Sequence, residues 1–169
     1  MVIILMGVSG SGKTTIGNLL SKRTGFPFFD GDDFHPEVNV QKMASGIPLT
    51  NQDRVDWIRE ISDFMNNIPG EHKILACSAL NRSIRSLIIN GIKEPCYFVF
   101  LKGDYDLIKD RMDKREAHYM KSGMLTSQFK TLEEPENTVT IGVDNSPDRI
   151  CDEIYKAVQE KIKACTEGG

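Results

Sequence analysis

The chain lacks the features that several classes of protein require. Its four cysteines form no C-x-x-C pair and have no nearby histidine ligands, so neither a zinc site nor a disulfide framework is indicated. No apolar run approaches the roughly 20 residues of a membrane-spanning helix. Basic residues are not in excess, because 21 of them stand against 24 acidic ones and the net charge is −3. We therefore expect a cytoplasmic protein with reduced core thiols, no membrane partner and no nucleic-acid partner.

What is present fits one globular domain. Hydrophobic residues make up 40% of the chain and charged residues 27%, which is typical of a soluble fold. A length of 169 residues suffices to bury one core, and no internal repeat or low-complexity tract divides the chain. A single domain over residues 1–169 is the prediction.

Short apolar runs alternate with helical patterns along the chain. The runs show no polar alternation, which favours strands buried on both faces of a parallel sheet. Strands that alternate with helices imply right-handed βαβ crossovers and a three-layer α/β fold with a five-stranded parallel sheet. Helix starts are predicted at a Thr50–Asp53 capping box and at Ser146-Pro147. The predicted strands are 2–6, 26–29, 74–77, 97–101 and 139–143.

Residues 7–14 carry the most specific chemical pattern. They match G-x-x-x-x-G-K-[ST] in full, after a predicted strand and before an amphipathic helix, as the pattern requires. Backbone N–H groups of such a loop converge on phosphates, while Lys13 bridges the β- and γ-phosphates and the Thr14 hydroxyl holds Mg²⁺. The alternative is a Gly/Ser turn with an unrelated lysine. The predicted nucleotide-binding residues are Gly7, Val8, Ser9, Gly10, Ser11, Gly12, Lys13, Thr14 and Thr15.

Two missing motifs refine the choice of nucleotide and metal ligand. No Asn-Lys-x-Asp guanine-recognition motif follows any predicted strand, so ATP is expected rather than GTP. The strand at 74–77 ends in Ser78 and not in a Walker-B carboxylate. Support for Mg²⁺ must therefore come from another carboxylate.

An acidic turn follows the second predicted strand and supplies that carboxylate. Ligands bind at the carboxyl ends of parallel strands, where the phosphate loop also lies. Asp30, Asp32 and Asp33 repel one another unless a cation or a substrate hydroxyl lies between them. We expect Asp30 to support Mg²⁺ through water, and Asp32 or Asp33 to accept the proton of a substrate hydroxyl. A solvated turn is the competing interpretation, and His35 is either a site residue or the N-cap of a helix starting at Pro36.

Arginines form a second group of candidates, because guanidinium forks match phosphate geometry. Arg111 and Arg115 lie four residues apart on one predicted helix, a spacing at which like charges repel unless an anion lies nearby. We expect Arg111 to bind the nucleotide and Arg115 to act in catalysis. The alternative is a solvated helix face, because Asp110 and Lys114 share that spacing. Arg82 and Arg85 are further candidates, as either anion ligands or ion-pair partners. Arg54 is also a candidate, and its alternative is a surface helix position.

Two further features have open interpretations. The segment 116–134 is polar with weak apolar periodicity, which suits a mobile lid over ATP or a structural loop. Trp57 is the only tryptophan and is either core or the wall of a cavity.

With these motifs in view, the chain resembles the gluconokinases, within the shikimate-kinase-like and nucleoside-monophosphate-kinase-like P-loop enzymes. The phosphate loop alone indicates only the superfamily, whereas two other blocks are more particular. One runs from Asp30-Gly-Asp-Asp-Phe-His-Pro36 through Lys42-Met43 to Gly46-Ile-Pro-Leu-Thr-Asn-Gln-Asp-Arg54, and the other is Leu125-Thr-Ser-Gln-Phe-Lys-Thr-Leu-Glu133. The matching stretches extend over residues 6–143. The chain departs from the family pattern at Asn81, where a lysine is usual, and at Ser83, Ser86 and Lys121.

The resemblance implies an ATP-dependent, Mg²⁺-dependent transfer of a phosphoryl group to the 6-hydroxyl of D-gluconate. It implies a substrate-capturing region at 31–68, a lid at 116–134 and a homodimer. A flexible, polyhydroxylated anion needs cations for its carboxylate and paired donors and acceptors for its hydroxyls. The substrate contacts that it implies are Asp32, His35, Asn39, Lys42, Met43, Arg54, Arg82, Arg85 and Gln128.

Two other functions remain open at this stage. One is a kinase for another small acceptor, such as shikimate or a nucleoside monophosphate. The other is a non-catalytic nucleotide switch, which would bind ATP without phosphorylating any acceptor.

Overall fold

The computed structural model describes residues 1–114 and 122–167. Within these ranges five parallel strands form one sheet in the order β2-β3-β1-β4-β5. This confirms the predicted α/β fold, and each strand end lies within two residues of its predicted position. The strands are β1 (Val2–Met6), β2 (Phe28–Asp30), β3 (Lys73–Ala76), β4 (Cys96–Lys102) and β5 (Val139–Gly142).

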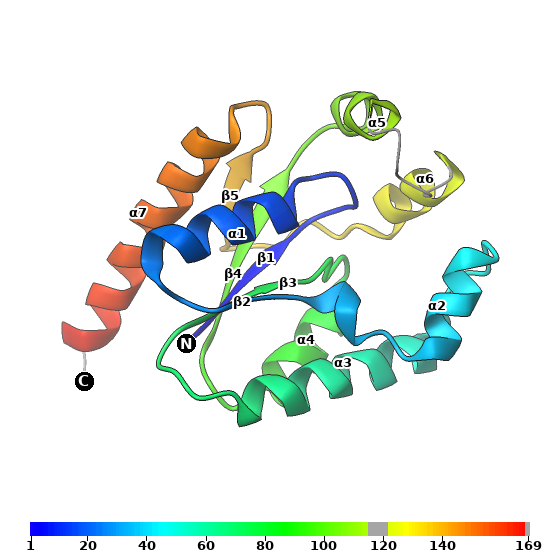
Figure 1. The fold of residues 1–169 in the computed structure, drawn as a ribbon. Helices are drawn as coiled ribbons and strands as arrows, with labels where there is room; N and C mark the ends of the chain where they lie inside the picture. Colours follow the sequence, from blue (N-terminus) through cyan, green and yellow to red (C-terminus); the bar gives the residue numbers. More distant parts are fainter. Residues whose placement is uncertain (115–121, 168–169) are drawn as a thin grey trace.

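Helices cover both faces of the sheet (Figure 1). Helices α1 and α7 pack together on one face, and α3 and α4 pack together on the other. One predicted loop segment, 116–134, contains a helix that periodicity did not indicate, α6. The helical elements are α1 (Lys13–Thr24), the 3₁₀ turn η1 (Gly31–Phe34), α2 (Glu37–Ala44), α3 (Asn51–Asn67), α4 (Arg82–Gly91), α5 (Tyr105–Asp113), α6 (Ser122–Thr131) and α7 (Pro147–Glu167).

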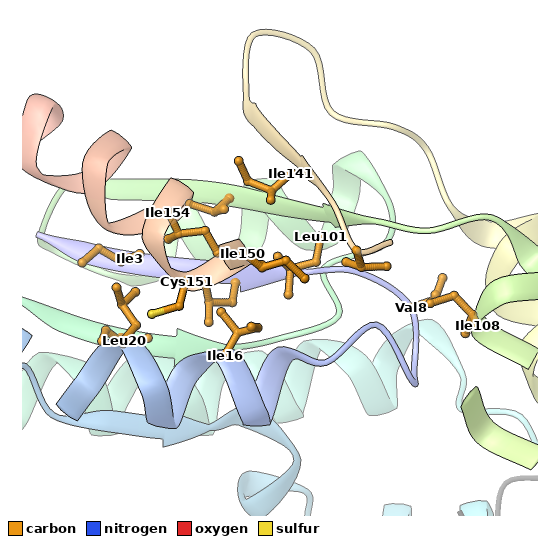
Figure 2. Close-up of a cluster of buried hydrophobic side chains, with 14 of the residues drawn as sticks. Ile3, Val8, Ile16, Leu20, Leu101, Ile108, Ile141, Ile150, Cys151 and Ile154 are labelled. Atoms are coloured by element: carbon orange, nitrogen blue, oxygen red, sulfur yellow. The ribbon is translucent and has the colours of Figure 1, made fainter. Parts of the chain in front are cut away.

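The central strand β1 explains why its sequence is apolar throughout. Ile3 and Leu5 belong to the core under α1 and α7, whereas Val2, Ile4 and Met6 belong to the core under α3 and α4. Successive strand residues point to opposite faces, so a strand covered on both sides needs apolar residues at every position. Figure 2 shows the first of these cores, where side chains of α1 and α7 meet the sheet.

The predicted helix starts are confirmed. Thr50 caps α3 with both hydrogen bonds of a capping box to Asp53, and α7 begins at Pro147, where the Ser146 hydroxyl accepts a hydrogen bond from the Arg149 N–H. The alternative role of His35 as an N-cap is wrong. Pro36 occupies that position at the start of α2 and makes no side-chain cap, because its ring has no acceptor.

The cysteines follow the prediction in part. Cys77 and Cys151 are buried free thiols, Cys96 is half-buried, and Cys165 is exposed and therefore not a core thiol. No helix in the described ranges is both long and apolar enough to cross a bilayer.

Candidate active site

The phosphate loop connects the carboxyl end of β1 to α1. Gly7 has a φ of 150° and its N–H donates to the Ser78 carbonyl, which ties the loop to the end of β3. Gly10 has a φ of 80°, and a Cβ there would lie 2.8 Å from Met112 Cγ of α5. Side chains disfavour both the backbone angle and the close approach. The glycines therefore let the loop fold tightly between α1 and α5.

Helix α1 begins directly after this loop at Lys13. Its N-cap is Gly12, in the left-handed conformation, and glycine has no side chain with which to satisfy the N–H groups of the first turn. Uncapped N–H groups at a helix start bind anions, and the helix dipole adds to the attraction. The start of α1 thus fits a nucleotide phosphate.

Lys13 lies across the loop that precedes it. Its Nζ donates to the carbonyls of Gly7 at 2.9 Å and Val8 at 3.0 Å. Although the side chain keeps some exposed surface, the protein atoms around the ammonium lower the pKa of Lys13, and the Asp32 carboxylate opposes that shift. The neighbouring Cys77 is buried, which raises the pKa of its thiol to about 12 and leaves it protonated. This geometry fits the predicted phosphate-binding role of Lys13, and the protonated Cys77 thiol is a poor nucleophile.

Thr14 and Asp30 form the position expected for the metal. The Thr14 hydroxyl donates to Asp30 Oδ2 at 2.6 Å, which links the first turn of α1 to the end of β2. Hydroxyl and carboxylate oxygens are ligands that Mg²⁺ prefers. The described residues contain no cluster of three His, Cys, Asp or Glu side chains able to hold a metal by themselves. The pair therefore fits a Mg²⁺ ion that takes its other ligands from water and nucleotide phosphates.

A groove of about 370 Å³ opens beside this pair. Its walls come from the first turns of α1, from β2 and from η1. The lining residues are Thr14, Asn18, Phe28, Phe29, Asp30, Asp33 and Phe34.

Asp32 lies on η1 and interacts electrostatically with Lys13. Its N–H donates to Asp30 Oδ1 at 3.1 Å, so the Asp30 side chain caps this short turn. Surrounding protein atoms that displace bulk water, followed by repulsion from Asp30, raise the pKa of Asp32, while Lys13 lowers it. Its side chain is nevertheless 79% exposed, so water screens these effects and leaves the carboxylate accessible to a substrate. Between the two candidate bases, Asp32 is the one that interacts with Lys13.

His35 packs behind Asp32 and stacks on Trp57. The two ring centroids lie 4.2 Å apart at 16°, and the His35 side chain is 6% exposed. Burial lowers the pKa of His35, although its Nε2 lies 3.9 Å from an Asp32 oxygen. Trp57 is 4% exposed and donates from Nε1 to the Gly31 carbonyl at 2.7 Å. Trp57 is therefore a core residue that also supports the acidic turn.

Two residues of α2 that were predicted to contact the phosphoryl acceptor connect α2 to α3. The buried Asn39 donates to the Asp53 carbonyl at 3.1 Å, and Lys42 donates to both Asp53 oxygens at 2.8 Å. The hydrogen bonds from Lys42 and then from Thr50 lower the pKa of the Asp53 carboxyl to about 2. Met43 and Arg54 are half-buried, and Arg54 Nη1 lies 3.5 Å from Asn51 Oδ1. The roles of these residues toward an acceptor stay predictions.

Arg82 and Arg85 begin α4 but differ in environment. Arg82 is 70% exposed and pairs with Glu136 at 2.7 Å. Arg85 is buried and donates to the carbonyl of Ala79, and desolvation lowers its pKa while Glu133 raises it. Asn81, at a position where the family pattern has lysine, accepts from the Ile84 N–H and caps the helix.

Two contacts between residues far apart in the sequence were not predicted from the sequence. Glu133 accepts from the Arg82 N–H at 2.9 Å, and Gln128 accepts from the Ser9 N–H at 2.7 Å. Both residues belong to the block 125–133, whose family-like pattern was the only available signal. Arg111 donates to the Val143 carbonyl and thus ties α5 to the segment after β5. Arg115, the predicted partner of Arg111, lies outside the described residues.

Comparison of this chain with known protein families, sequences and structures agrees with this geometry. A model of the shikimate kinase family matches residues 9–159. A probable gluconokinase from Mus musculus is 39% identical over 96% of this chain and 97% of that protein, and the thermosensitive gluconokinase of Escherichia coli is 37% identical over 92% and 86%. The crystal structure of a gluconokinase from Sinorhizobium meliloti superposes with a TM-score of 0.90 at 34% identity, over 99% of this chain and 97% of that one. The chain belongs to the gluconokinase family.

Membership of the gluconokinase family makes the chain a P-loop kinase with ATP as the phosphoryl donor. The loop at 7–14, with Lys13 and the Thr14–Asp30 pair, fits the predicted donor half of the site. Asp32 adjoins this pair through its hydrogen bond to Asp30, and the predicted roles of Asp32 and His35 toward an acceptor stay predictions.

Proposed function

We propose that this protein transfers the γ-phosphoryl group of ATP to the 6-hydroxyl of D-gluconate, forming ADP and 6-phospho-D-gluconate. The observation that carries the proposal is that Asp30 accepts hydrogen bonds from both the Asp32 N–H and the Thr14 hydroxyl, which brings the acidic turn to the residue that follows Lys13. A base, a phosphate-binding cation and a metal position then surround one small volume. The choice of gluconate as the acceptor is supported by similarity over nearly the whole chain to gluconokinases from several organisms.

Each of these residues has a chemical role in an in-line transfer. Asp32 accepts the proton of the hydroxyl, whose oxygen attacks the γ-phosphorus while the bond to the bridging oxygen of ADP breaks. Lys13 stabilises the charge on the β- and γ-phosphates. Thr14 and Asp30 would hold Mg²⁺, which would neutralise phosphate charge. Arg111 and Arg115 are proposed to contact the nucleotide and the transferred group.

The acceptor contacts are proposed from the same family pattern. They are Asp32, His35, Asn39, Lys42, Met43 and Arg54 in a substrate-capturing region at 31–68, together with Arg82 and Arg85 of α4. A lid at 116–134 is proposed to cover the site, and its Gln128 contacts the phosphate loop instead. Lys42 and Arg54 supply positive charge suited to the gluconate carboxylate. We further propose that the protein is a homodimer, which sedimentation of the purified protein would test. We also propose that it is cytoplasmic.

The deciding experiment measures ADP formation with a panel of acceptors. The panel contains gluconate, other aldonates, shikimate, AMP and CMP, each with and without Mg²⁺. We expect turnover with gluconate, a Mg²⁺ requirement, and a loss of about 100- to 1,000-fold in the Lys13→Ala variant. Turnover that requires shikimate or a nucleoside monophosphate instead would overturn the assignment. Binding of ATP with no turnover of any acceptor would indicate a nucleotide switch.

A further inference from the structure

A hydrogen bond joins the phosphate loop to a helix far away in the sequence. Gln128 Oε1, on α6, accepts from the backbone N–H of Ser9 at 2.7 Å. The two residues are 119 positions apart, and Gln128 is half-buried. Figure 1 shows α6 at the same end of the sheet as the loop that precedes α1.

Packing fixes the position of Gln128 relative to the loop. Leu125, one turn earlier on α6, is 1% exposed and shares a core cluster with Val8 of the loop and Ile108 of α5. Phe129, the residue after Gln128, packs its ring edge-on against the Tyr105 ring of α5, with the two ring centroids 5.5 Å apart. Helix α6 is therefore packed against both the loop and α5, and this packing brings Gln128 next to Ser9.

Ser9 lies where the loop has few other restraints. The Val8 carbonyl, just before it, accepts from Lys13 Nζ, and Gly10, just after it, has a φ of 80°. Within the described parts of the chain, Gln128 is the only side chain that accepts from a backbone N–H of residues 7–12. A restraint on Ser9 therefore sets the path of the loop between the lysine-bound carbonyl and the glycine turn.

The chemistry of an amide suits this place. A glutamate would also accept from the Ser9 N–H, but it would bring a negative charge toward bound phosphates. Glutamine provides the acceptor without that charge. No other described residue accepts or donates to the Gln128 side chain, so the bond to Ser9 is its main structural contact.

We propose that Gln128 is a positioning residue of the donor site, which holds the phosphate loop in its nucleotide-binding conformation. This assignment differs from the sugar-acid contact that the family pattern implies for Gln128. The assignment rests on the proposed function, because it specifies how one residue of the proposed kinase site acts. It predicts that loss of the hydrogen bond weakens nucleotide binding and leaves gluconate binding unchanged.

The test compares separate binding of ADP with Mg²⁺ and of gluconate by calorimetry. The variant is Gln128→Leu, which keeps the size of the side chain and removes its acceptor. We expect about 5- to 10-fold weaker ADP binding, the effect of one lost hydrogen bond, with an unchanged Kd for gluconate. In steady-state assays the KM for ATP should rise while the KM for gluconate does not.

Two control variants separate positioning from general loosening of α6. Ser127→Ala changes an exposed neighbour on the same helix and should leave both dissociation constants unchanged. Leu125→Ala removes core packing but not the Gln128 oxygen, and should lower the melting temperature more than Gln128→Leu does.

Three outcomes overturn the proposal. They are weaker gluconate binding alone, equal weakening of both ligands, and no change in either. The first would identify Gln128 as a sugar-acid contact. Failure of the unaltered protein to bind gluconate would count against the proposed function instead, and the ADP measurements would still decide the role of Gln128.

Discussion

The Thr14 hydroxyl donates to Asp30 Oδ2 at 2.6 Å, so the first turn of α1 and the end of β2 share one polar contact. The strand β2 lies at the edge of the sheet, separated from β1 by β3. Because all these strands are parallel, their carboxyl ends lie on the same side, and the contact forms across the intervening strand. The same contact positions a carboxylate next to the hydroxyl of the phosphate loop.

Asp30→Asn should weaken the use of Mg²⁺ while the fold persists. The amide keeps the size of the side chain but loses the negative charge that would orient metal-bound water. We expect activity to fall about 10- to 100-fold and the Mg²⁺ concentration for half-maximal rate to rise. The measurement is a Mg²⁺ titration of the initial rate at saturating ATP. An unchanged titration midpoint would remove Asp30 from the metal site.

Asp32→Asn should lower kcat by about 100-fold or more, with little change in the Kd for ATP, because a general base acts only in the chemical step. Asp33→Asn is the matched control, since Asp33 is the next residue and is also exposed. A larger loss of kcat in the Asp33 variant would reverse the choice of base. A change in the gluconate KM alone would make Asp32 a binding residue.

The pH dependence of activity gives an independent test of Asp32. Desolvation and the neighbouring Asp30 raise the pKa of Asp32 above its ordinary value of 3.8. The base acts as a carboxylate, so activity is lost as pH falls through this raised pKa. We therefore expect the acid limb of kcat/KM to lie above pH 3.8 and to disappear in Asp32→Asn. A limb at the same pH in the variant would assign it to another group.

Asp53→Asn should destabilise the packing of α2 on α3. Hydrogen bonds from Lys42 and Thr50 hold the pKa of Asp53 at about 2, below its unfolded value. The stabilisation is therefore fully present above pH 4 and is lost as pH falls through about 2. Because 30% of the Lys42 side chain is exposed, we expect the melting temperature to fall by only about 1–3 °C at pH 7. Thermal melts between pH 2 and 7 should show this difference shrinking toward acid; a constant difference would contradict the charge-based origin.

Gly17→Ala should destabilise the protein although alanine favours helices. A Cβ at Gly17 would lie 2.1 Å from the Phe28 ring, so α1 can approach β2 only with glycine there. We expect a cost of about 1–3 kcal/mol from overpacking, measured by urea denaturation. Phe28→Leu frees space at that contact, and the double variant should lose less stability than the two single changes added together. Strict additivity would show that the clash is relieved elsewhere.

Local patterns in the sequence account for most of the fold. The uninterrupted apolar runs predicted the strands because a sheet covered on both faces needs apolar residues at every position. The Thr50–Asp53 capping box and Ser146-Pro147 predicted two helix starts because capping depends on residues within one turn. Helix α6 was missed, since its apolar face contacts the phosphate loop and α5 through few residues, chiefly Leu125 and Phe129.

By itself, the sequence determined the nature of the donor site. The spacing of Gly7, Gly12, Lys13 and Thr14 specifies a phosphate loop because those residues act through backbone geometry within one short segment. Only the tertiary structure decided which distant side chains support it. His35 stacks on Trp57, and Gln128 binds Ser9 from 119 residues away. Such partners depend on how whole helices pack against the sheet, and no local pattern contains that information.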